Sequence, residues 1–456
     1  MPGRAAAGAA VAVAKRQPGQ RPWRRALAWL AFLAPFFYLS YGGANYLASL
    51  REHVPSIVFE WEGNIPFLAW TIFPYWSIDV FYGLSLLLSR TRHELDRHGL
   101  RLLTAQVLAV SCFLAAPLAF SLAQPAADGV AGGLFTTLRS FDKPFNQAPS
   151  LHIALAVILW DLYRRLLTAR WAKWILHAWT LLICASVLTT YQHHFFDIPT
   201  GVLLGLLCVW AWPLERRVPP WKGWRWTRDP KRIRIAVAYA LGAAAFAVSA
   251  LHWQGAALWL FWPTIALLMV ALNYLVLGAR GFGKDRFHGT PWAMRWLLLP
   301  YRWMAWLNSR WWTFRQLAAV PVAPDVWLGR VPGTHAGVPW RSAVDLTAEL
   351  DSPACVPTIH LPAIDLVAPT PAWLLRAARA IERQRARHGS VIAFCALGYS
   401  RSAAAIATWL LLTGRAGRVE DAIEDVRNAR PAVVLGPAHA LAIAGAWAIA
   451  CGGGGE

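Results

Sequence analysis

A cysteine and an arginine stand close together in a short turn between an apolar run and an alanine-rich run. Val391 to Phe394 is typical of a buried strand that ends at Cys395, and Ala403 to Leu412 is typical of a helix. A turn that leads into a helix N-terminus directs its backbone N–H groups at whatever lies above the cysteine. Arg401 adds a planar fork for two phosphate oxygens, and nearby positive charge favours a thiolate. The stretch predicts an anion-binding loop with a nucleophilic thiol at its base, the plainer alternative being a structural cysteine before an ordinary helix.

This turn resembles the signature loop of protein tyrosine and dual-specificity phosphatases. Five residues separate Cys395 from Arg401, with Gly398 between them and Ser402 directly after. The resemblance covers roughly residues 320–450 and implies that Cys395 attacks phosphorus, while Ser402 helps the thiolate to leave in the second step. It also implies that the loop binds phosphate through Arg401 and through the positions Ala396, Leu397, Gly398, Tyr399, Ser400 and Ser402.

A general acid for the departing oxygen is expected on a loop upstream of the cysteine. Asp365 lies thirty positions before Cys395, and Pro369 and Pro371 follow it. Dual-specificity phosphatases carry their general acid at about this distance, so the resemblance gives that role to Asp365. One position departs from the family pattern, because Phe394 stands where the family usually has a histidine that supports the thiolate from behind.

The composition of the turn bears on substrate and cofactor. Between Cys395 and Arg401 there is no other Lys or Arg. Phosphatases that act on multiply phosphorylated inositol lipids tend to have extra basic residues here, so a neutral loop favours a substrate with one phosphate monoester. No metal or other cofactor is expected, because an arginine and backbone amides can supply the positive charge.

The composition of the chain as a whole indicates a membrane protein with an attached polar domain. Of 456 residues 57% are hydrophobic and 28 are Trp, and the mean hydropathy is +0.38. These values result when apolar segments of about 20 residues are joined to a more polar part. The net charge of +20 does not indicate a nucleic-acid partner, because Lys and Arg cluster in short loops between apolar segments.

Length and hydropathy predict about eight spans. Arg-rich loops alternate with charge-poor loops, so the positive-inside rule places both termini in the cytoplasm and the protein in the inner membrane. One basic loop is expected to hold Arg90, Arg92, Arg97 and Arg101. A cytoplasmic Cys395 would also stay reduced, as its chemistry requires. The predicted spans are 26–46, 65–89, 102–123, 151–168, 174–191, 198–214, 235–252 and 256–278.

A second group of ionisable residues lies at the predicted extracytoplasmic side. Ser150 and His152 open one span, and His193 and Asp197 lie between two others. Ionisable residues at a membrane edge are functional candidates. His193 and Asp197 are four positions apart, so the carboxylate can hold the imidazole in one tautomer, and His152 is then available as an acid. This arrangement suits attack on phosphorus through a phosphohistidine.

These residues resemble the type 2 phosphatidic acid phosphatase superfamily, and the Pro-Ser-Leu-His form resembles its inositol-phosphorylceramide-synthase-like branch. The resemblance covers roughly residues 60–215 and implies that Ser150 helps to bind phosphate. The family's first motif supplies a basic residue that residues 117–121 lack, and Arg139 and Lys143 are the possible substitutes. The alternatives are a helix cap at Ser150, interfacial histidines, and a domain that serves as a lipid-binding anchor.

The C-terminal part has a different character. From Val320, short β-like runs alternate with amphipathic helices, which predicts an α/β fold. Besides the strand before Cys395 and the helix after it, the expected strands are 326–329 and 343–346 and the expected helices 371–387 and 419–429. The expected fold class is therefore a multi-pass α-helical membrane domain followed by a cytoplasmic α/β cysteine-phosphatase domain. The predicted parts are a disordered basic tail 1–25, a membrane domain 26–215, a basic loop 216–234, two further membrane helices 235–278, an interfacial Trp/Arg-rich linker 279–319, a phosphatase domain 320–450 and a flexible tail 451–456.

The sequence thus predicts a membrane-bound phosphatase that forms a cysteinyl-phosphate intermediate and acts on a phospholipid or lipid-precursor monophosphate. Two alternatives stay open. One is a lipid phosphotransferase that works at His152, His193 and Asp197, with a regulatory phosphatase domain. The other is a phosphatase of phosphorylated proteins that uses its spans only as an anchor in membrane lipid.

Overall fold

The structure is a computed structural model that describes residues 21–215, 218–286, 288–333, 338–352 and 356–452. The chain forms two compact units, Met1–Gly205 and Leu206–Glu456. Most of the predicted N-terminal tail, Arg216 and Arg217 of one basic loop, Cys355 and residues 453–456 of the C-terminal tail lie outside the described residues.

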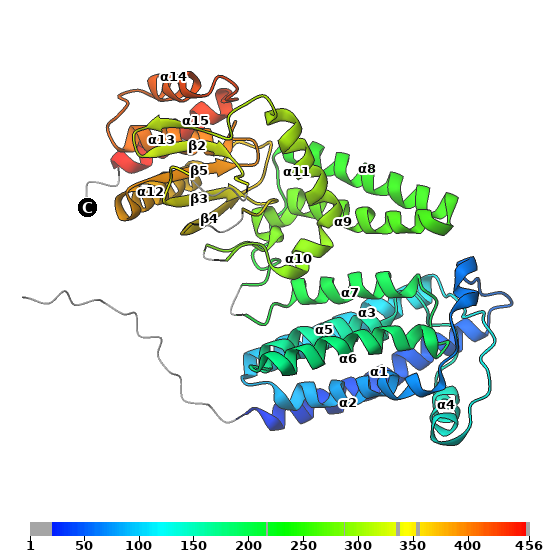
Figure 1. Ribbon diagram of the computed structural model, residues 1–456. Helices are drawn as coiled ribbons and strands as arrows, with labels where there is room; N and C mark the ends of the chain where they lie inside the picture. The colour runs from blue at the N-terminus through cyan, green and yellow to red at the C-terminus, as the bar shows by residue number, and fades with distance from the viewer. Residues whose placement is uncertain (1–20, 216–217, 287, 334–337, 353–355, 453–456) are drawn as a thin grey trace, which may run out of the picture. The chain divides into compact units, whose positions relative to one another are not determined.

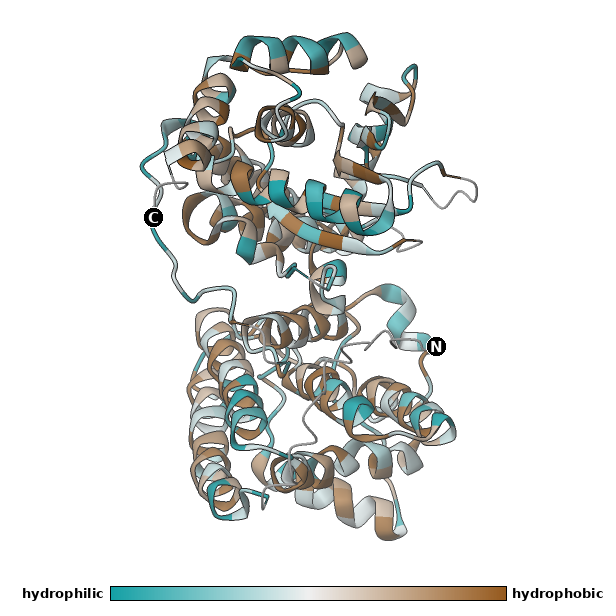
Figure 2. Cartoon of the chain, turned by 90° about the vertical axis from the view of Figure 1, so that its left-hand side faces the viewer, coloured by the Kyte–Doolittle hydropathy of each residue, from teal (hydrophilic) through white to brown (hydrophobic). Residues whose placement is uncertain are grey.

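The first unit is helical (Figure 1). Thr91 shows how one of its helices begins: its hydroxyl accepts the Glu94 backbone N–H, while the Glu94 carboxylate accepts the Arg90 N–H, so two end donors are satisfied. Large apolar side chains such as Leu39 and Val80 are exposed, as lipid contact requires. Figure 2 shows that apolar residues are frequent along the helices of this unit. The helices are α1 (Trp23–Ser49), α2 (Ile72–Leu88), α3 (Arg92–Ala115), α4 (Gly129–Phe141), α5 (Leu151–Leu166), α6 (Arg170–Thr189) and α7 (Asp197–Ala211), with short 3-10 turns at Glu60–Asn64 and Ala69–Thr71.

Six helical segments within the described residues are long and apolar enough to cross a membrane. Two of the eight predicted spans do not reach that length, because α5 has 16 residues and α7 has 15. At 1.5 Å per residue they are about 24 Å and 22 Å long, less than the ~30 Å of a bilayer core. Most of α5 is buried inside the unit, which explains how a short helix can pack among longer ones.

One predicted loop is wrong in its extent. Arg90 lies between α2 and α3 as predicted, but Arg92, Arg97 and Arg101 lie on α3. The residues after Ala115 leave the helix, although the prediction continued the span to 123. Arg101 is fully buried and pairs with the equally buried Asp161 of α5 at 2.8 Å. A buried charge is stable only when it is paired, and this partner lies 60 positions away in the sequence. The polar residues in the first turns of α3 therefore gave the prediction a loop where the structure has a helix.

The second unit begins with a helical hairpin. Helices α8 (Pro230–Trp253) and α9 (Phe261–Leu272) pack against each other, and α9 continues through the turns η4 (Asn273–Leu277) and η5 (Gly278–Phe282). We call the segment from Pro230 to Phe282 the membrane hairpin, because both of its arms are among the six candidate spans. Two Trp-rich helices, α10 (Trp292–Leu297) and α11 (Leu299–Thr313), lead from the hairpin to the α/β part.

The α/β part is a five-stranded sheet flanked by helices, in agreement with the predicted class (Figure 1). The strand order is β1-β2-β5-β3-β4, with β1 antiparallel and the others parallel, so the predicted strand β5 is central. Two strands, β1 and β4, and the last helix were not predicted. The elements are β1 (Ala319–Ala323), β2 (Val326–Arg330), β3 (Ser342–Thr347), β4 (Thr358–Ala363), α12 (Pro371–His388), β5 (Val391–Cys395), α13 (Arg401–Leu412), α14 (Val419–Ala429) and α15 (Pro437–Gly452).

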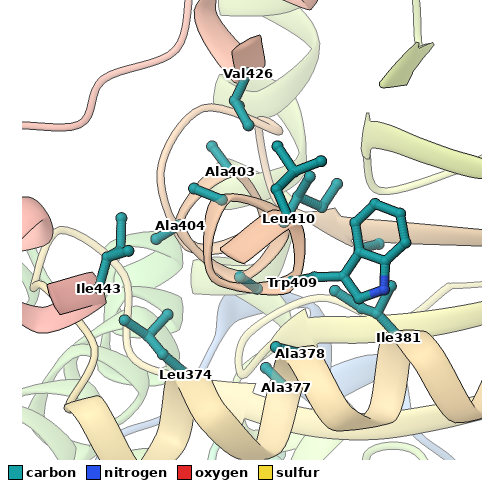
Figure 3. Close-up of a cluster of buried hydrophobic side chains, with 14 of the residues drawn as sticks. Leu374, Ala377, Ala378, Ile381, Ala403, Ala404, Trp409, Leu410, Val426 and Ile443 are labelled. Atoms are coloured by element: carbon teal, nitrogen blue, oxygen red, sulfur yellow. The ribbon is translucent and has the colours of Figure 1, made fainter. Parts of the chain in front are cut away.

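Helix α13 lies in the centre of the core of this part. Figure 3 shows Trp409 and Leu410 of α13 among side chains of α12, α14 and α15, including Ile381 and Val426. Trp409 is fully buried and donates its indole N–H to Glu382 Oε2 at 2.8 Å. The helix that follows the cysteine loop is therefore held on all sides, and its first residue, Arg401, has a fixed position.

Candidate active sites

The cysteine loop connects the end of the central strand to the start of the central helix. β5 ends at Cys395, residues 396–400 form the loop, and α13 begins at Arg401. Gly398 has φ +77°, and a Cβ there would lie 2.7 Å from the Gly329 carbonyl group of the neighbouring strand. Only glycine fits both the left-handed conformation and the close approach.

Outer partners hold the carbonyl groups of the loop. Ser309 Oγ donates to Ala396 O at 2.6 Å, Arg430 Nη2 to Leu397 O at 3.2 Å, and Val434 N to Tyr399 O at 2.8 Å. Because these carbonyls face outward, the loop amides face inward, and Gly398 N lies 3.3 Å from the Cys395 sulfur. The result is a nest of N–H groups around the thiol.

The thiol also receives a side-chain hydrogen bond. Ser402 Oγ donates to Cys395 Sγ at 3.2 Å, and both residues are buried. Phe394, at the position where a histidine was expected from the family pattern, is fully buried in an apolar cluster with Ile392 and Val331. Ser400, another predicted loop position, pairs its hydroxyl with His439 Nε2 at 2.8 Å.

Arg401 is oriented by a carboxylate that the sequence did not reveal. Glu349 accepts two parallel hydrogen bonds from Arg401, at 2.7 Å and 2.9 Å, and the Ala363 carbonyl accepts a third. Asp365 Oδ1 lies 3.0 Å from Arg401 Nη2. The remaining donor, Nε, is buried and has no hydrogen-bond partner among the described residues. The guanidinium is thus fixed on one edge and keeps Nε for an incoming anion.

The two carboxylates beside Arg401 differ in acidity. Burial raises the pKa of Asp365 above its ordinary value and the Glu349 charge adds to this, although Arg401 acts in the opposite direction. Burial also opposes ionisation of Glu349, but the charge and hydrogen bonds of Arg401 outweigh it, so the pKa of Glu349 falls below its ordinary value. One carboxyl group is therefore suited to carry a proton and the other to stay ionised.

The membrane hairpin contacts the loop of the proposed general acid. Tyr274 of η4 donates its hydroxyl to the Asp365 backbone carbonyl at 3.1 Å. Its ring lies 5.7 Å from that of Tyr239 on α8, which in turn lies 5.8 Å from Tyr301 on α11. Leu366, directly after Asp365, has φ +60°, a conformation that costs energy for a side chain of this size.

A lysine from the segment after the hairpin enters the same region. Lys284 Nζ is buried and donates to Asp345 Oδ2 at 2.7 Å, to both oxygens of Thr347 at 2.8 Å and 3.0 Å, and to the Leu350 carbonyl. These acceptors flank Glu349, which holds Arg401. Lys284 therefore fixes the turn that orients the arginine.

The second group of predicted residues gathers in the first unit. His193 Nδ1 lies 3.1 Å from Asp197 Oδ2, as the spacing of four suggested, and the same oxygen accepts the His194 N–H at 3.0 Å. His152 stacks on Tyr75 with 4.2 Å between ring centroids. His152 and His193 line one cavity of about 320 Å³.

His194 has a partner that was not predicted. Glu62 Oε2 lies 2.8 Å from His194 Nδ1 and also accepts the Phe195 N–H at 3.0 Å. Because Ser121 N donates to His194 Nε2, the proton of this imidazole lies on Nδ1 and points at the carboxylate. His194 is thus a structural residue that fixes the histidine segment.

Three residues expected at this second site have other contacts. Ser150 caps α5, since its hydroxyl accepts the Ile153 N–H. The substitutes considered for the missing basic residue are not at the cavity: Arg139 Nε donates to Phe135 O of its own helix, and Lys143 Nζ lies 3.2 Å from Ser49 Oγ. The idea that Arg139 or Lys143 replaces the family's basic residue is therefore wrong for this structure.

The residues that sequence reasoning missed share one feature. Glu349, Lys284 and Glu62 find their partners 52, 61 and 132 positions away, so no local spacing indicates them. Only Glu349 carried a local signal, since it follows the polar end of a predicted strand closely, as an active-site residue of a parallel sheet often does.

Comparison with known proteins identifies both halves. Residues 98–217 match the PAP2 superfamily, and residues 342–443 match the dual specificity phosphatase catalytic domain. The chain is thus a fusion of a PAP2-superfamily domain and a dual-specificity phosphatase domain, and it is a phosphoric monoester hydrolase. The six long apolar helices among the described residues, together with the PAP2-superfamily match, indicate a membrane protein.

Several solved structures are similar to part of the chain. Human DUSP28 is 24% identical over 29% of this chain and 95% of its own, with a TM-score of 0.27. Tk-PTP in its active form is 23% identical over 29% of this chain and 97% of its own, with a TM-score of 0.25. PTPMT1 in complex with PI(5)P is 18% identical over 30% of this chain and 98% of its own, with a TM-score of 0.27. No curated protein matches the chain.

Proposed function

We propose that the protein hydrolyses the phosphate monoester of a membrane lipid or lipid precursor through a cysteinyl-phosphate at Cys395. The sulfur attacks phosphorus while Asp365 gives its proton to the departing lipid oxygen. Arg401 Nε, the Nη2 hydrogen that Asp365 now contacts, and the loop amides bind the three remaining oxygens. Binding of the phosphate therefore frees the Asp365 carboxyl group for proton transfer.

The second step returns the enzyme to its starting state. Water attacks the cysteinyl-phosphate, Asp365 takes the proton of that water, and the P–S bond breaks to give inorganic phosphate and a thiolate. Ser402, which already donates to the sulfur, stabilises the departing thiolate. The products are one lipid alcohol and one phosphate for each water consumed.

The lipid substrate rests on one observation: the membrane hairpin and the linker hold the catalytic loops directly. Tyr274 binds the carbonyl of Asp365, and α11 binds the cysteine loop twice, through Ser309 and through the Trp312 carbonyl, which accepts from Tyr399 Oη at 2.9 Å. A site attached in this way to the end of a membrane hairpin is close to the headgroups.

The linker helix supports the same conclusion. α11 exposes four Trp rings on its surface, and aromatic rings of this kind favour the headgroup region of a bilayer. The exposed large apolar side chains of α11 and of the residue after it are Trp303, Met304, Trp306, Leu307, Trp311, Trp312 and Phe314. We therefore assign residues 279–319 to the membrane interface and residues 320–450 to the cytoplasmic face of the inner membrane, with both termini in the cytoplasm.

An assay of the full chain in vesicles tests the substrate. Wild type and Cys395→Ser are compared on a lipid monophosphate, a phosphotyrosine peptide and a phosphoinositide with several phosphates. The proposal predicts that the lipid monophosphate is hydrolysed most efficiently and that Cys395→Ser has no activity on it. A preference for the peptide would instead support a protein phosphatase with a membrane anchor, and retained activity in Cys395→Ser would refute the mechanism.

A second function is supported by the His193–Asp197 pair beside His152 in one cavity. This arrangement fits a phosphotransferase in which His193 Nε2 attacks phosphorus and the soluble domain is regulatory. His193→Ala distinguishes the two sites: it would abolish headgroup transfer and leave hydrolysis at Cys395 unchanged. Loss of hydrolysis in His193→Ala would show that the monoesterase is the membrane site.

A further inference from the structure

The cavity of the first unit has a charge that does not suit a phosphate monoester. Asp79 of α2 and Asp142, which follows α4, both line it together with His152 and His193, and no lining residue in the described part of the chain is Lys or Arg. A phosphate monoester carries up to two negative charges at neutral pH. It would approach two carboxylates without a lysine or arginine to compensate, which is unfavourable in a site of low dielectric.

The lining of the cavity suits a cation instead. Besides the two carboxylates it is largely aromatic, and the faces of such rings attract ammonium groups. Asp142 is held in place by Asn45, whose amide donates to it at 3.2 Å. The volume of about 320 Å³ is at the lower end of the range for small-molecule sites. The aromatic lining residues are Phe37, Tyr38, Tyr41, Tyr75, Trp76, Tyr82 and Phe141.

One imidazole atom at the cavity lacks a partner, which is a separate indication of a ligand. Nε2 of His152 is buried and has no hydrogen-bond partner among the described residues. His193, whose Nδ1 contacts Asp197, lines the same cavity. Buried polar atoms are normally hydrogen-bonded, so the His152 nitrogen is available to a polar group in the cavity.

The position of the cavity points to a lipid. Its walls come from α1, α2, α4 and α5, of which α1 and α2 are candidate spans. Tyr38 and Phe141 are both lining and exposed, so the cavity opens on the surface of the helical unit. His152 and His193 are near ends of apolar helices, and the ends of membrane helices are close to the lipid headgroups.

We propose that this cavity binds a lipid whose headgroup carries a protonated amine, with the ammonium between Asp79 and Asp142 and against the aromatic rings. Two sources supply that chemistry: a zwitterionic phospholipid with a primary amine, or a long-chain amine without phosphate. The site does not depend on the reaction at Cys395. It adds a lipid-binding function to the half of the chain that lacks the basic residue for a phosphate monoester.

Lipid competition on the full chain in nanodiscs tests this site. The purified protein is exchanged into discs that contain phosphatidylethanolamine, phosphatidylglycerol, phosphatidic acid or a long-chain amine, and the retained lipid is measured by native mass spectrometry. We expect phosphatidylethanolamine to be retained about tenfold over both anionic lipids, since a charge-assisted hydrogen bond contributes at least that factor. Equal or stronger retention of phosphatidic acid would overturn the proposal.

The discs with the long-chain amine and three variants show which groups of the lipid and of the cavity are needed for binding. Retention of the long-chain amine shows that the ammonium alone is sufficient, whereas retention of phosphatidylethanolamine alone shows that the cavity also uses the phosphodiester. Asp79→Asn and Asp142→Asn each reduce retention about tenfold, while the exposed Asp128→Asn does not. Unchanged retention in both cavity variants, in protein that still hydrolyses a soluble monophosphate through Cys395, contradicts the site. If a variant does not fold, the comparison of lipids on wild type decides alone.

Discussion

Replacing Lys284 by methionine tests whether the linker sets the geometry of the catalytic arginine. Lys284 lies between the membrane hairpin and α10, and its ammonium binds the turn that contains Glu349. Methionine has a similar volume and no charge, so packing is kept and the hydrogen bonds of the ammonium are lost. The turn keeps the contacts of Asp351 with the linker but loses the ammonium beside Glu349, so the carboxylate that orients Arg401 is less well fixed.

The expected loss of folding stability in Lys284→Met follows from the contacts that remain around Asp345. Its fully buried carboxylate keeps His360 Nδ1 at 2.9 Å and the Thr347 N–H at 2.9 Å, but not its cation. Breaking a buried ion pair costs about 3–5 kcal/mol, and the remaining partners favour the lower end, about 3 kcal/mol. A displacement of Arg401 by about 1 Å reduces kcat/KM roughly a hundredfold.

The assay combines thermal unfolding of the full chain in detergent with hydrolysis of a soluble monophosphate. The control is Lys222→Met, which removes an exposed lysine of the same unit and should change neither quantity. A double variant, Lys284→Met with Asp345→Asn, removes both charges and should lose less stability than the sum of the single variants. Additive losses, or a Lys284→Met enzyme that behaves like Lys222→Met, would refute the coupling.

Three further predictions concern the catalytic loop and its partners. Asp365 must be protonated to act as an acid, so the kcat of the wild-type enzyme should fall as pH rises through the raised pKa of Asp365. Asp365→Asn should lower kcat about 10²- to 10⁴-fold on a substrate with a poor leaving group. A pH–rate profile of the variant should also lack the decline at high pH. Glu349→Gln should destabilise the chain by about 3 kcal/mol at neutral pH in thermal unfolding. Because the folded pKa of Glu349 is depressed, its contribution is present above the ordinary carboxyl pKa and is lost as pH falls through the folded pKa, so the difference between Glu349→Gln and wild type should shrink in acid. Gly398→Ala should abolish hydrolysis, because the added Cβ would collide with the Gly329 carbonyl. The control Gly417→Ala, where a Cβ would meet open space, should keep the wild-type rate of hydrolysis. One rate measurement on each variant tests this.

Local sequence was sufficient where structure depends on neighbours in the chain. The apolar run before Cys395 became β5, the alanine-rich run became α13, and helix α14 occupies the predicted residues 419–429. The spacing of His193 and Asp197 likewise indicated their contact, because a helical turn alone brings them together.

Local sequence failed where a distant partner decides. Arg101 was placed in a loop, since nothing near it in the sequence shows that Asp161 will neutralise it inside the unit. Strand β4 has no strong apolar alternation and forms because β3 pairs with it in the sheet. The roles of Glu349 and Lys284 depend on contacts across more than 50 residues, so these residues become visible only in the folded chain.

Identification of the residue that carries the phosphate tests the central claim most directly. The full chain in vesicles is mixed with a radiolabelled lipid monophosphate, quenched in alkaline detergent within one turnover, digested at alkaline pH and sequenced by mass spectrometry, so that a phosphohistidine would also survive. The account predicts label on the peptide that contains Cys395 and no label in Cys395→Ser. Label on the peptide that contains His193, or full turnover by Cys395→Ser, would contradict it.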